Sequence, residues 1–184
     1  MKGTNVMKKM KFFSIVMGIV LLLSACKNPL QEKPKVNIDN VSWEMKMGIN
    51  YLDDRAAMVE FCNNSDFTIT ELSLEFRMKE NLPEDKLDEF YTYLKKEYNL
   101  SDDDVNEIRE TGVSMNSHAY LDEDEYIEKG QKFEETLLYG IKFIRTLEYC
   151  DLFEPEMYRI EYIDDIGEEH TTYYDYLNNT YTEK

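Results

Sequence analysis

Cys26 has the surroundings expected of a cysteine that reacts at a membrane surface. A mostly apolar stretch of 12 residues, residues 12–23, precedes it, and only Ser24 and Ala25 lie between the two. Three lysines stand just before the stretch, so its N-terminal end should stay on the cytoplasmic side. The stretch is too short to span a bilayer comfortably as a stable helix. The sequence therefore predicts that the Cys26 thiol lies at the membrane surface, directly after two small residues.

The segment Leu23-Ser24-Ala25-Cys26 resembles the lipobox of bacterial lipoproteins. The resemblance implies that the Cys26 thiol is joined to diacylglycerol and that a peptidase then cuts before Cys26. Residues 1–25 are then a lipoprotein signal peptide, and residues 26–35 a short extended tether. Two or three acyl chains such as palmitate hold a protein firmly, so we expect a lipid anchor on the extracytoplasmic face of the cell membrane. The alternative is an ordinary secretory signal that happens to contain a cysteine.

Cys62 and Cys150 are the two cysteines that remain after lipidation. Outside the cell they could form a disulfide. Closing a loop across 88 positions would stabilise the fold by roughly 4 kcal/mol in the chain-entropy model. Against this, the alternation of neighbouring residues places Cys62 on the solvent face of its strand. A disulfide and two free thiols both remain possible from the sequence.

The sequence shows no pattern typical of a metal site or a catalytic centre. Its two histidines, His118 and His170, do not have the spacing of zinc ligands. The acidic runs at residues 102–104 and 122–125 lack the spacing of a calcium loop, so we interpret them as a helix start and a solvated loop. Neither a Gly-x-Ser-x-Gly element nor a glycine-rich phosphate loop is present. We expect no metal, no cofactor and no catalytic residue.

The chain contains 14 tyrosines, and Tyr173, Tyr174 and Tyr176 cluster near its end. Tyrosine gives a large contact area at low entropic cost, so these three could form a binding patch for a protein or a glycan. Tyrosine is also common in strands and in the cores of sandwiches. The alternative is therefore that these side chains belong to the core.

The formal net charge of −17 excludes one class of partner. The charge before Cys26 comes from four lysines, and without them 17 basic residues face 38 acidic ones, a net charge of −21. Such a chain repels phosphate backbones, so we expect no nucleic-acid partner. It also repels anionic headgroups, so the membrane must be bound through the N-terminal diacylglyceryl cysteine. Cationic ligands would be attracted, although the charge could simply keep the surface soluble.

Apolar and polar residues alternate with a period of two over most of residues 36–181, which indicates half-buried strands. We expect these strands near residues 41–47, 57–62, 72–78, 113–121, 133–143, 158–162 and 169–176. This number of short strands with one apolar face predicts a mainly β, antiparallel two-sheet sandwich.

A helical insert interrupts the β pattern at residues 83–110. Leu87 and Phe90 fall at helical spacing on one face of the first helix. Ser101 followed by Asp104 makes a capping-box-like start for a second, shorter helix. The apolar face of the first helix should cover part of a sheet.

The sequence also resembles the small immunoglobulin-like, FxLYD-like extracellular domains of Gram-positive lipoproteins. The similarity lies in the NNSD turn at residues 63–66, the alternation ITELSLEF at 69–76, the KGQ turn at 129–131 and the hairpin YRIEYIDDIGEE at 158–169. The resemblance implies an immunoglobulin-like sandwich that acts as a binding or accessory domain, and it offers no catalytic residues to carry over.

The leading interpretation is a membrane-anchored, non-catalytic domain with an unknown protein or glycan ligand. Two alternatives stay open: a surface hydrolase that uses a pair of carboxylates, and a structural subunit of an assembly. A cleft with two close carboxylates would favour the hydrolase. An exposed apolar patch would favour the assembly subunit.

Overall fold

The computed structural model describes residues 33–120, 126–140 and 142–184, and Pro34–Lys184 form one compact unit. The expected signal peptide, the lipidation site Cys26 and most of the expected tether lie outside the described residues. Within the described part of the chain, no helix is long and apolar enough to cross a membrane.

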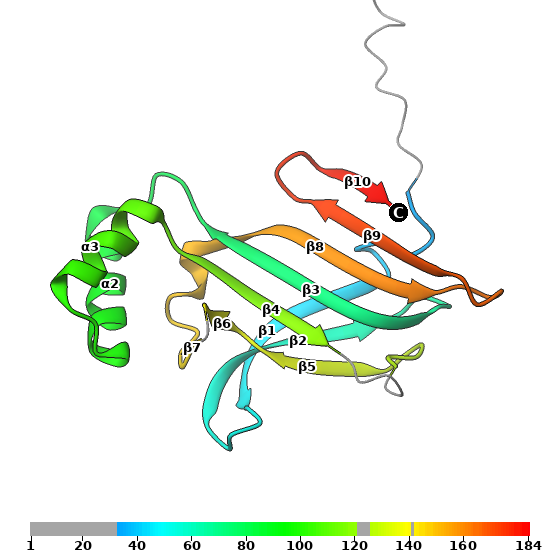
Figure 1. The fold of residues 1–184 in the computed structure, drawn as a ribbon, viewed down its shortest axis with the longest axis horizontal. Helices are drawn as coiled ribbons and strands as arrows, with labels where there is room; N and C mark the ends of the chain where they lie inside the picture. The colour runs from blue at the N-terminus through cyan, green and yellow to red at the C-terminus, as the bar shows by residue number, and fades with distance from the viewer. Residues whose placement is uncertain (1–32, 121–125, 141) are drawn as a thin grey trace, which may run out of the picture. The chain divides into compact units, whose positions relative to one another are not determined.

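Two antiparallel sheets build the unit (Figure 1). The smaller sheet consists of β1 (Val41–Ile49), β2 (Arg55–Asn63) and β5 (Lys132–Thr136), in that order. The strands of the larger sheet are β3 (Thr68–Met78), β4 (Ser114–Tyr120), β6 (Leu138–Tyr139), β7 (Lys142–Phe143), β8 (Phe153–Ile163), β9 (Glu169–Asp175) and β10 (Thr180–Glu183). Their order across that sheet is β10-β9-β8-β3-β4-β6-β7.

The apolar alternation of the sequence forms the core between the two sheets. Val59 and Phe61 of β2 are fully buried, and so are Leu72 and Leu74 of β3. Phe61 also stacks on the ring of Tyr158 in β8, with ring centroids 6.1 Å apart. Each such side chain contributes roughly 1.5–3 kcal/mol by leaving water, so this interface holds the sandwich together.

The chain passes from the smaller sheet to the larger one at Leu137, which corrects the expected single strand at residues 133–143. Leu137 lies between β5 and β6 and is fully buried. Its N–H donates to the carbonyl of Ala57 (2.8 Å), and its carbonyl accepts from the N–H of Ile144 (3.0 Å). A run that changes sheets has no single inward face, so its period does not reveal the break.

Strand β10 was not expected from the sequence. It pairs with β9 from Thr180, opposite Asp175, onward. The Asp175 carboxylate holds the connecting turn, because it accepts hydrogen bonds from the N–H groups of Leu177 (2.9 Å) and Asn178 (3.0 Å). Tyr181 is the one buried side chain among the four residues of β10. That is too little alternation to indicate a strand.

Two helices, α2 (Glu84–Tyr98) and α3 (Asp102–Thr111), lie between β3 and β4, as the sequence predicts. Phe90 and Leu94 of α2 are buried. The Phe90 ring meets that of Phe153, at the start of β8, edge to face with centroids 5.6 Å apart. Helix α2 therefore covers one end of the sandwich, next to the short 3-10 helix η1 (Cys150–Leu152).

Ser101 begins α3 with the predicted capping box. Its hydroxyl accepts from the N–H of Asp104 (3.1 Å), and its own N–H donates to the Asp104 carboxylate (2.8 Å). The hydroxyl and N–H of Ser101 hold the pKa of Asp104 below its usual value. The acidic run at residues 102–104 is thus a helix start. The predicted fold class, a mainly β antiparallel sandwich with a two-helix insertion, is confirmed.

Candidate functional site

The turn between β1 and β2 presents three large apolar side chains to solvent. Ile49, Tyr51 and Leu52 are 63%, 78% and 58% exposed. Asn50, among them, is buried, and its side-chain oxygen accepts from the N–H groups of Leu52 (2.9 Å) and Asp54 (3.0 Å). The inward Asn50 side chain holds the turn and leaves its apolar neighbours outside. We call Ile49, Tyr51 and Leu52 the hairpin tip; the hairpin projects beyond both sheets (Figure 1).

Two contacts connect the hairpin tip to its surroundings. The Tyr51 ring meets the Phe143 ring edge to face, with centroids 5.5 Å apart. The Arg145 guanidinium lies 3.4 Å from the carboxylates of both Asp54, in the turn, and Glu97, in α2. These ion pairs are solvated, so each is worth roughly 0–1 kcal/mol. They orient the hairpin beside α2 and leave its apolar surface uncovered.

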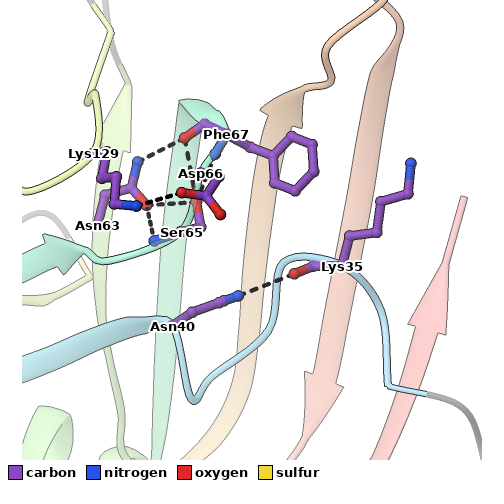
Figure 2. A network of polar contacts seen from close by, with 7 residues as sticks. All are labelled: Lys35, Asn40, Asn63, Ser65, Asp66, Phe67 and Lys129. Atoms are coloured by element: carbon purple, nitrogen blue, oxygen red, sulfur yellow. Dashed lines mark hydrogen bonds and ion pairs between the residues drawn. The ribbon is translucent and has the colours of Figure 1, made fainter.

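The described chain enters the domain at the other end of β1 (Figure 2). The Asn40 amide donates to the carbonyl of Lys35 (3.0 Å), and the Asn37 amide to that of Pro34 (2.8 Å). The Lys35 ammonium lies 5.8 Å from the centre of the Phe67 ring. Strand β1 has nine residues. At roughly 3.4 Å per residue, it separates this entry end from the hairpin tip by roughly 27 Å.

Asn63 is the centre of a buried polar network at the entry end (Figure 2). Its side-chain nitrogen donates to the carbonyls of Phe67 and Ile127, both at 2.8 Å. Its side-chain oxygen accepts from the N–H (2.9 Å) and the hydroxyl (2.7 Å) of Ser65. Both donors and both acceptor positions of the amide are thus in use. The hydrogen bonds of Asn63 and Ser65 therefore give the NNSD turn a structural role.

The outer face of the larger sheet carries a charged ladder. The Glu71 carboxylate lies 2.6 Å from Nε2 of His118 and 2.6 Å from a guanidinium nitrogen of Arg159. Arg159 also pairs with Glu161, which is opposite Glu71 in the register of β3 and β8. An acid and a base in catalysis need different environments, whereas these two carboxylates share one cation. The arrangement links strands rather than forming a hydrolytic pair.

A second ladder lies on the outer face of the smaller sheet. Glu60 of β2 is nearly buried and pairs with Lys132 of β5 and Lys46 of β1. Hydrogen bonds from Lys132 and Lys46 lower the pKa of Glu60 to about 2. Lys46 also pairs with Glu134. These charges are accounted for by pairing across the three strands.

The structure does not bring Tyr173, Tyr174 and Tyr176 into one exposed patch. Tyr174 is buried and meets Tyr176 edge to face, with centroids 4.7 Å apart. The Tyr176 hydroxyl accepts from the indole N–H of Trp43 in the other sheet (3.0 Å). Tyr173 lies on the opposite face of β9, where the Lys184 ammonium is 5.2 Å from its ring centre. Tyr174 and Tyr176 therefore pack with the core, which is the alternative to a binding patch that the sequence left open.

Cys62 and Cys150 are free thiols, so the disulfide considered from the sequence is absent from the structure. Cys62 lies near the start of β3, whereas Cys150 lies near its end, because Met78 pairs with Phe153. Strand β3 has 11 residues and is roughly 33 Å long, but a disulfide needs Cα atoms within about 7 Å. Burial also raises the pKa of Cys150 to about 11, which keeps it protonated.

Asp164, Glu168 and His170, at the turn between β8 and β9, each offer a possible metal ligand, and the ligand atoms lie within 4.8 Å of one another. Asp164 already has a role in the turn, because its carboxylate accepts from the N–H groups of Glu168 and Ile166, both at 3.0 Å. The N–H of Glu168 is the main reason that the pKa of Asp164 is low. The spacing of this group resembles no metal motif, so sequence reasoning did not single it out.

Comparison with known proteins finds no family model, no curated protein and no solved structure that matches the chain. The function is therefore argued from the residues themselves. The carboxylates of the two charged ladders pair with cations of the chain, and the Asn63 amide is fully hydrogen-bonded. The hairpin tip, in contrast, leaves apolar area in water.

Proposed function

We propose that this chain is a lipid-anchored binding protein of a bacterial cell membrane, without catalytic activity, and that its hairpin tip contacts a protein partner. The observation that carries the proposal is the joint exposure of Ile49, Tyr51 and Leu52 on one projecting turn. Single exposed apolar residues need no explanation. Three large ones within four positions cost solubility and are typical of an interaction site.

The place of the hairpin tip supports this proposal. The proposed anchor, Cys26, precedes Pro34, and Pro34 belongs to the entry end of β1. The hairpin tip is at the other end of that strand. A partner can therefore reach the tip without meeting the point at which the tether joins the domain.

The shape and chemistry of the hairpin tip favour a protein over a glycan. Its aliphatic and aromatic side chains project from a turn, so they fit a socket in a partner. Stacking on a sugar calls for an aromatic platform, and Tyr174 and Tyr176 are in the core instead. The hairpin tip is also the kind of exposed apolar patch that we expect of a structural subunit of an assembly. Both interpretations agree on a protein contact.

Photo-crosslinking in living cells tests the proposal. We would place p-benzoylphenylalanine at Tyr51 and, as a matched control, at Ile166 in the β8–β9 turn, since both side chains are 78% exposed. A discrete adduct is expected from position 51 only, and Leu52→Asp should reduce it strongly at unchanged protein level. Equal adducts from both positions, or an adduct at 51 that ignores Leu52→Asp, would show that the tip is not a binding site.

A further inference from the structure

A groove runs along α2, one helical turn from Glu97, the residue that Arg145 connects to Asp54 in the turn between β1 and β2. Its volume is about 650 Å³. The rings of Tyr93 and Tyr149 line it, with centroids 4.9 Å apart. The charged residues that line it are Asp85, Asp88, Glu89 and Lys96. Three carboxylates thus face one ammonium group around an aromatic pair.

The three carboxylates of this groove are exposed to solvent, and two of them form ion pairs within the chain. Asp85, Asp88 and Glu89 have the spacing i, i+3 and i+4, so they lie on one helix face and repel one another. Asp88 pairs with Arg109 and Glu89 with Lys86, but the two carboxylate side chains are 58% and 60% exposed. Such solvated pairs contribute little and exchange readily. A cation placed between the carboxylates would relieve their repulsion.

The aromatic pair also limits which ligands fit the groove. Tyrosine rings attract cations over their faces, and they also pack against aliphatic chains. A lysine or arginine side chain has both parts, an apolar stem and a charged head. The net charge of −17 draws such groups toward the surface and disfavours a second copy of the chain as the occupant.

A second cavity, of about 550 Å³ beside α3, lacks this character. Its Asp104 is occupied in the capping box with Ser101. The ammonium of Lys142 lies 5.0 Å from the centre of the Tyr98 ring, whereas among the described residues no cation lies over the ring of Tyr93 or Tyr149. The groove on α2 therefore has the stronger claim to a basic ligand.

We propose that the groove on α2 binds a segment rich in arginine or lysine in the protein that contacts the hairpin tip. This inference rests on the proposed function and adds the chemistry of the partner. Apolar residues of the partner cover the tip, and its basic side chains lie over Tyr93 and Tyr149 with their charges toward Asp85, Asp88 and Glu89.

The test uses the full chain in detergent and a fluorescein-labelled hexa-arginine peptide, followed by anisotropy at low salt. The double variant Asp85→Asn/Glu89→Gln should bind the peptide about fivefold or more weakly. The matched control Asp165→Asn/Glu169→Gln removes the same charges from exposed positions at the β8–β9 turn and should bind within about twofold of the wild type. Equal weakening in both would mean attraction by net charge alone and would overturn the inference.

The aromatic part of the site has its own pair of variants. Tyr149→Leu should weaken hexa-arginine binding about threefold at constant charge, whereas Tyr149→Phe keeps the ring and should bind normally. Unchanged fluorescence of Trp43 would show that both variants are folded. If Tyr149→Leu binds as well as Tyr149→Phe, the groove is not the site. Leu52→Asp should leave peptide binding intact, so a failure here is distinct from a failure of the crosslinking test at the hairpin tip.

Discussion

Asn63→Ala should destabilise the domain by about 3 kcal/mol. The substitution removes four hydrogen bonds of a fully buried side chain, to Phe67, Ile127 and Ser65. Each is worth roughly 1 kcal/mol net. The loss is not larger, because the Ile127 carbonyl still accepts from the N–H of Ile69 (3.1 Å), and the Ser65 hydroxyl, which no longer donates to Asn63, can donate to the Phe67 carbonyl (3.2 Å). The N–H of Ser65 is the group that loses its acceptor.

Urea unfolding followed by the fluorescence of Trp43 measures this loss, because Trp43 is the single tryptophan and packs on Phe76 in the core (5.4 Å). The matched control is Asn64→Ala, the exposed neighbour with the same chemistry, which should change stability by less than about 0.5 kcal/mol. In a thermal scan Asn63→Ala should melt roughly 6–12 °C lower. If both variants unfold at the same urea concentration, the buried network does not hold the entry end, and the argument from its hydrogen bonds is wrong.

Two further predictions concern the anchor and acid stability. Cys26→Ala should release the protein or prevent its normal processing, whereas Cys62→Ser should stay in the detergent phase of a phase-partition assay; a Cys26→Ala variant that is cleaved normally and still partitions into the detergent phase would refute the anchor. The pKa of Glu60 is lowered from 4.5 to about 2, so its ion pairs stabilise the fold above pH 4.5 and are lost as the pH falls toward 2. Glu60→Gln should therefore lose less stability than the wild type between about pH 6 and pH 3, as measured by urea midpoints; parallel losses would contradict this.

The strands and helices were predictable where one side of an element is exposed to solvent and the other side is buried. In β8, buried and half-buried side chains alternate from Tyr158 to Ile163, and α2 keeps Phe90 and Leu94 on one face. The capping box at Ser101 is a local signal and was found for that reason. The point at Leu137 where the chain passes from one sheet to the other could not be predicted. A residue buried between two sheets has no solvent-exposed neighbour face that would mark the change.

The site residues were missed because exposure depends on where another element ends. Ile49 continues the alternation of Val41, Trp43, Met45 and Met47 in β1, and by that pattern it belongs to the core. It is exposed at the end of a hairpin whose turn projects from the rest of the ribbon (Figure 1). The signal in the sequence was the turn residue Asn50 between two large apolar residues.

For the tyrosine cluster, the sequence suggested a binding patch where the structure has side chains that pack with the core. Tyr174 and Tyr176 share one face of β9 and its continuation, as alternation requires, and that face is turned toward the other sheet. The partner of Tyr176 is Trp43, which is 133 positions away in the chain. A contact at that separation depends on how the two sheets pack, and no local pattern contains it. Tyrosine content alone therefore could not distinguish a binding surface from a core.

Strand β1 links the two ends of the domain on which the proposals depend. Its first residue, Val41, pairs with Asn63 of the entry network, and its last, Ile49, pairs with Arg55 beside the hairpin tip. A partner that pulls on the tip against an anchor at Cys26 would load β1 and β2 along their length. Such a load acts on both ends of β1 at the same time, and the Asn63 network receives it directly at the entry end. Under the proposed function, the hairpin tip would meet the partner at one end of β1, and the Asn63 network would hold the domain together at the other end, where the tether joins.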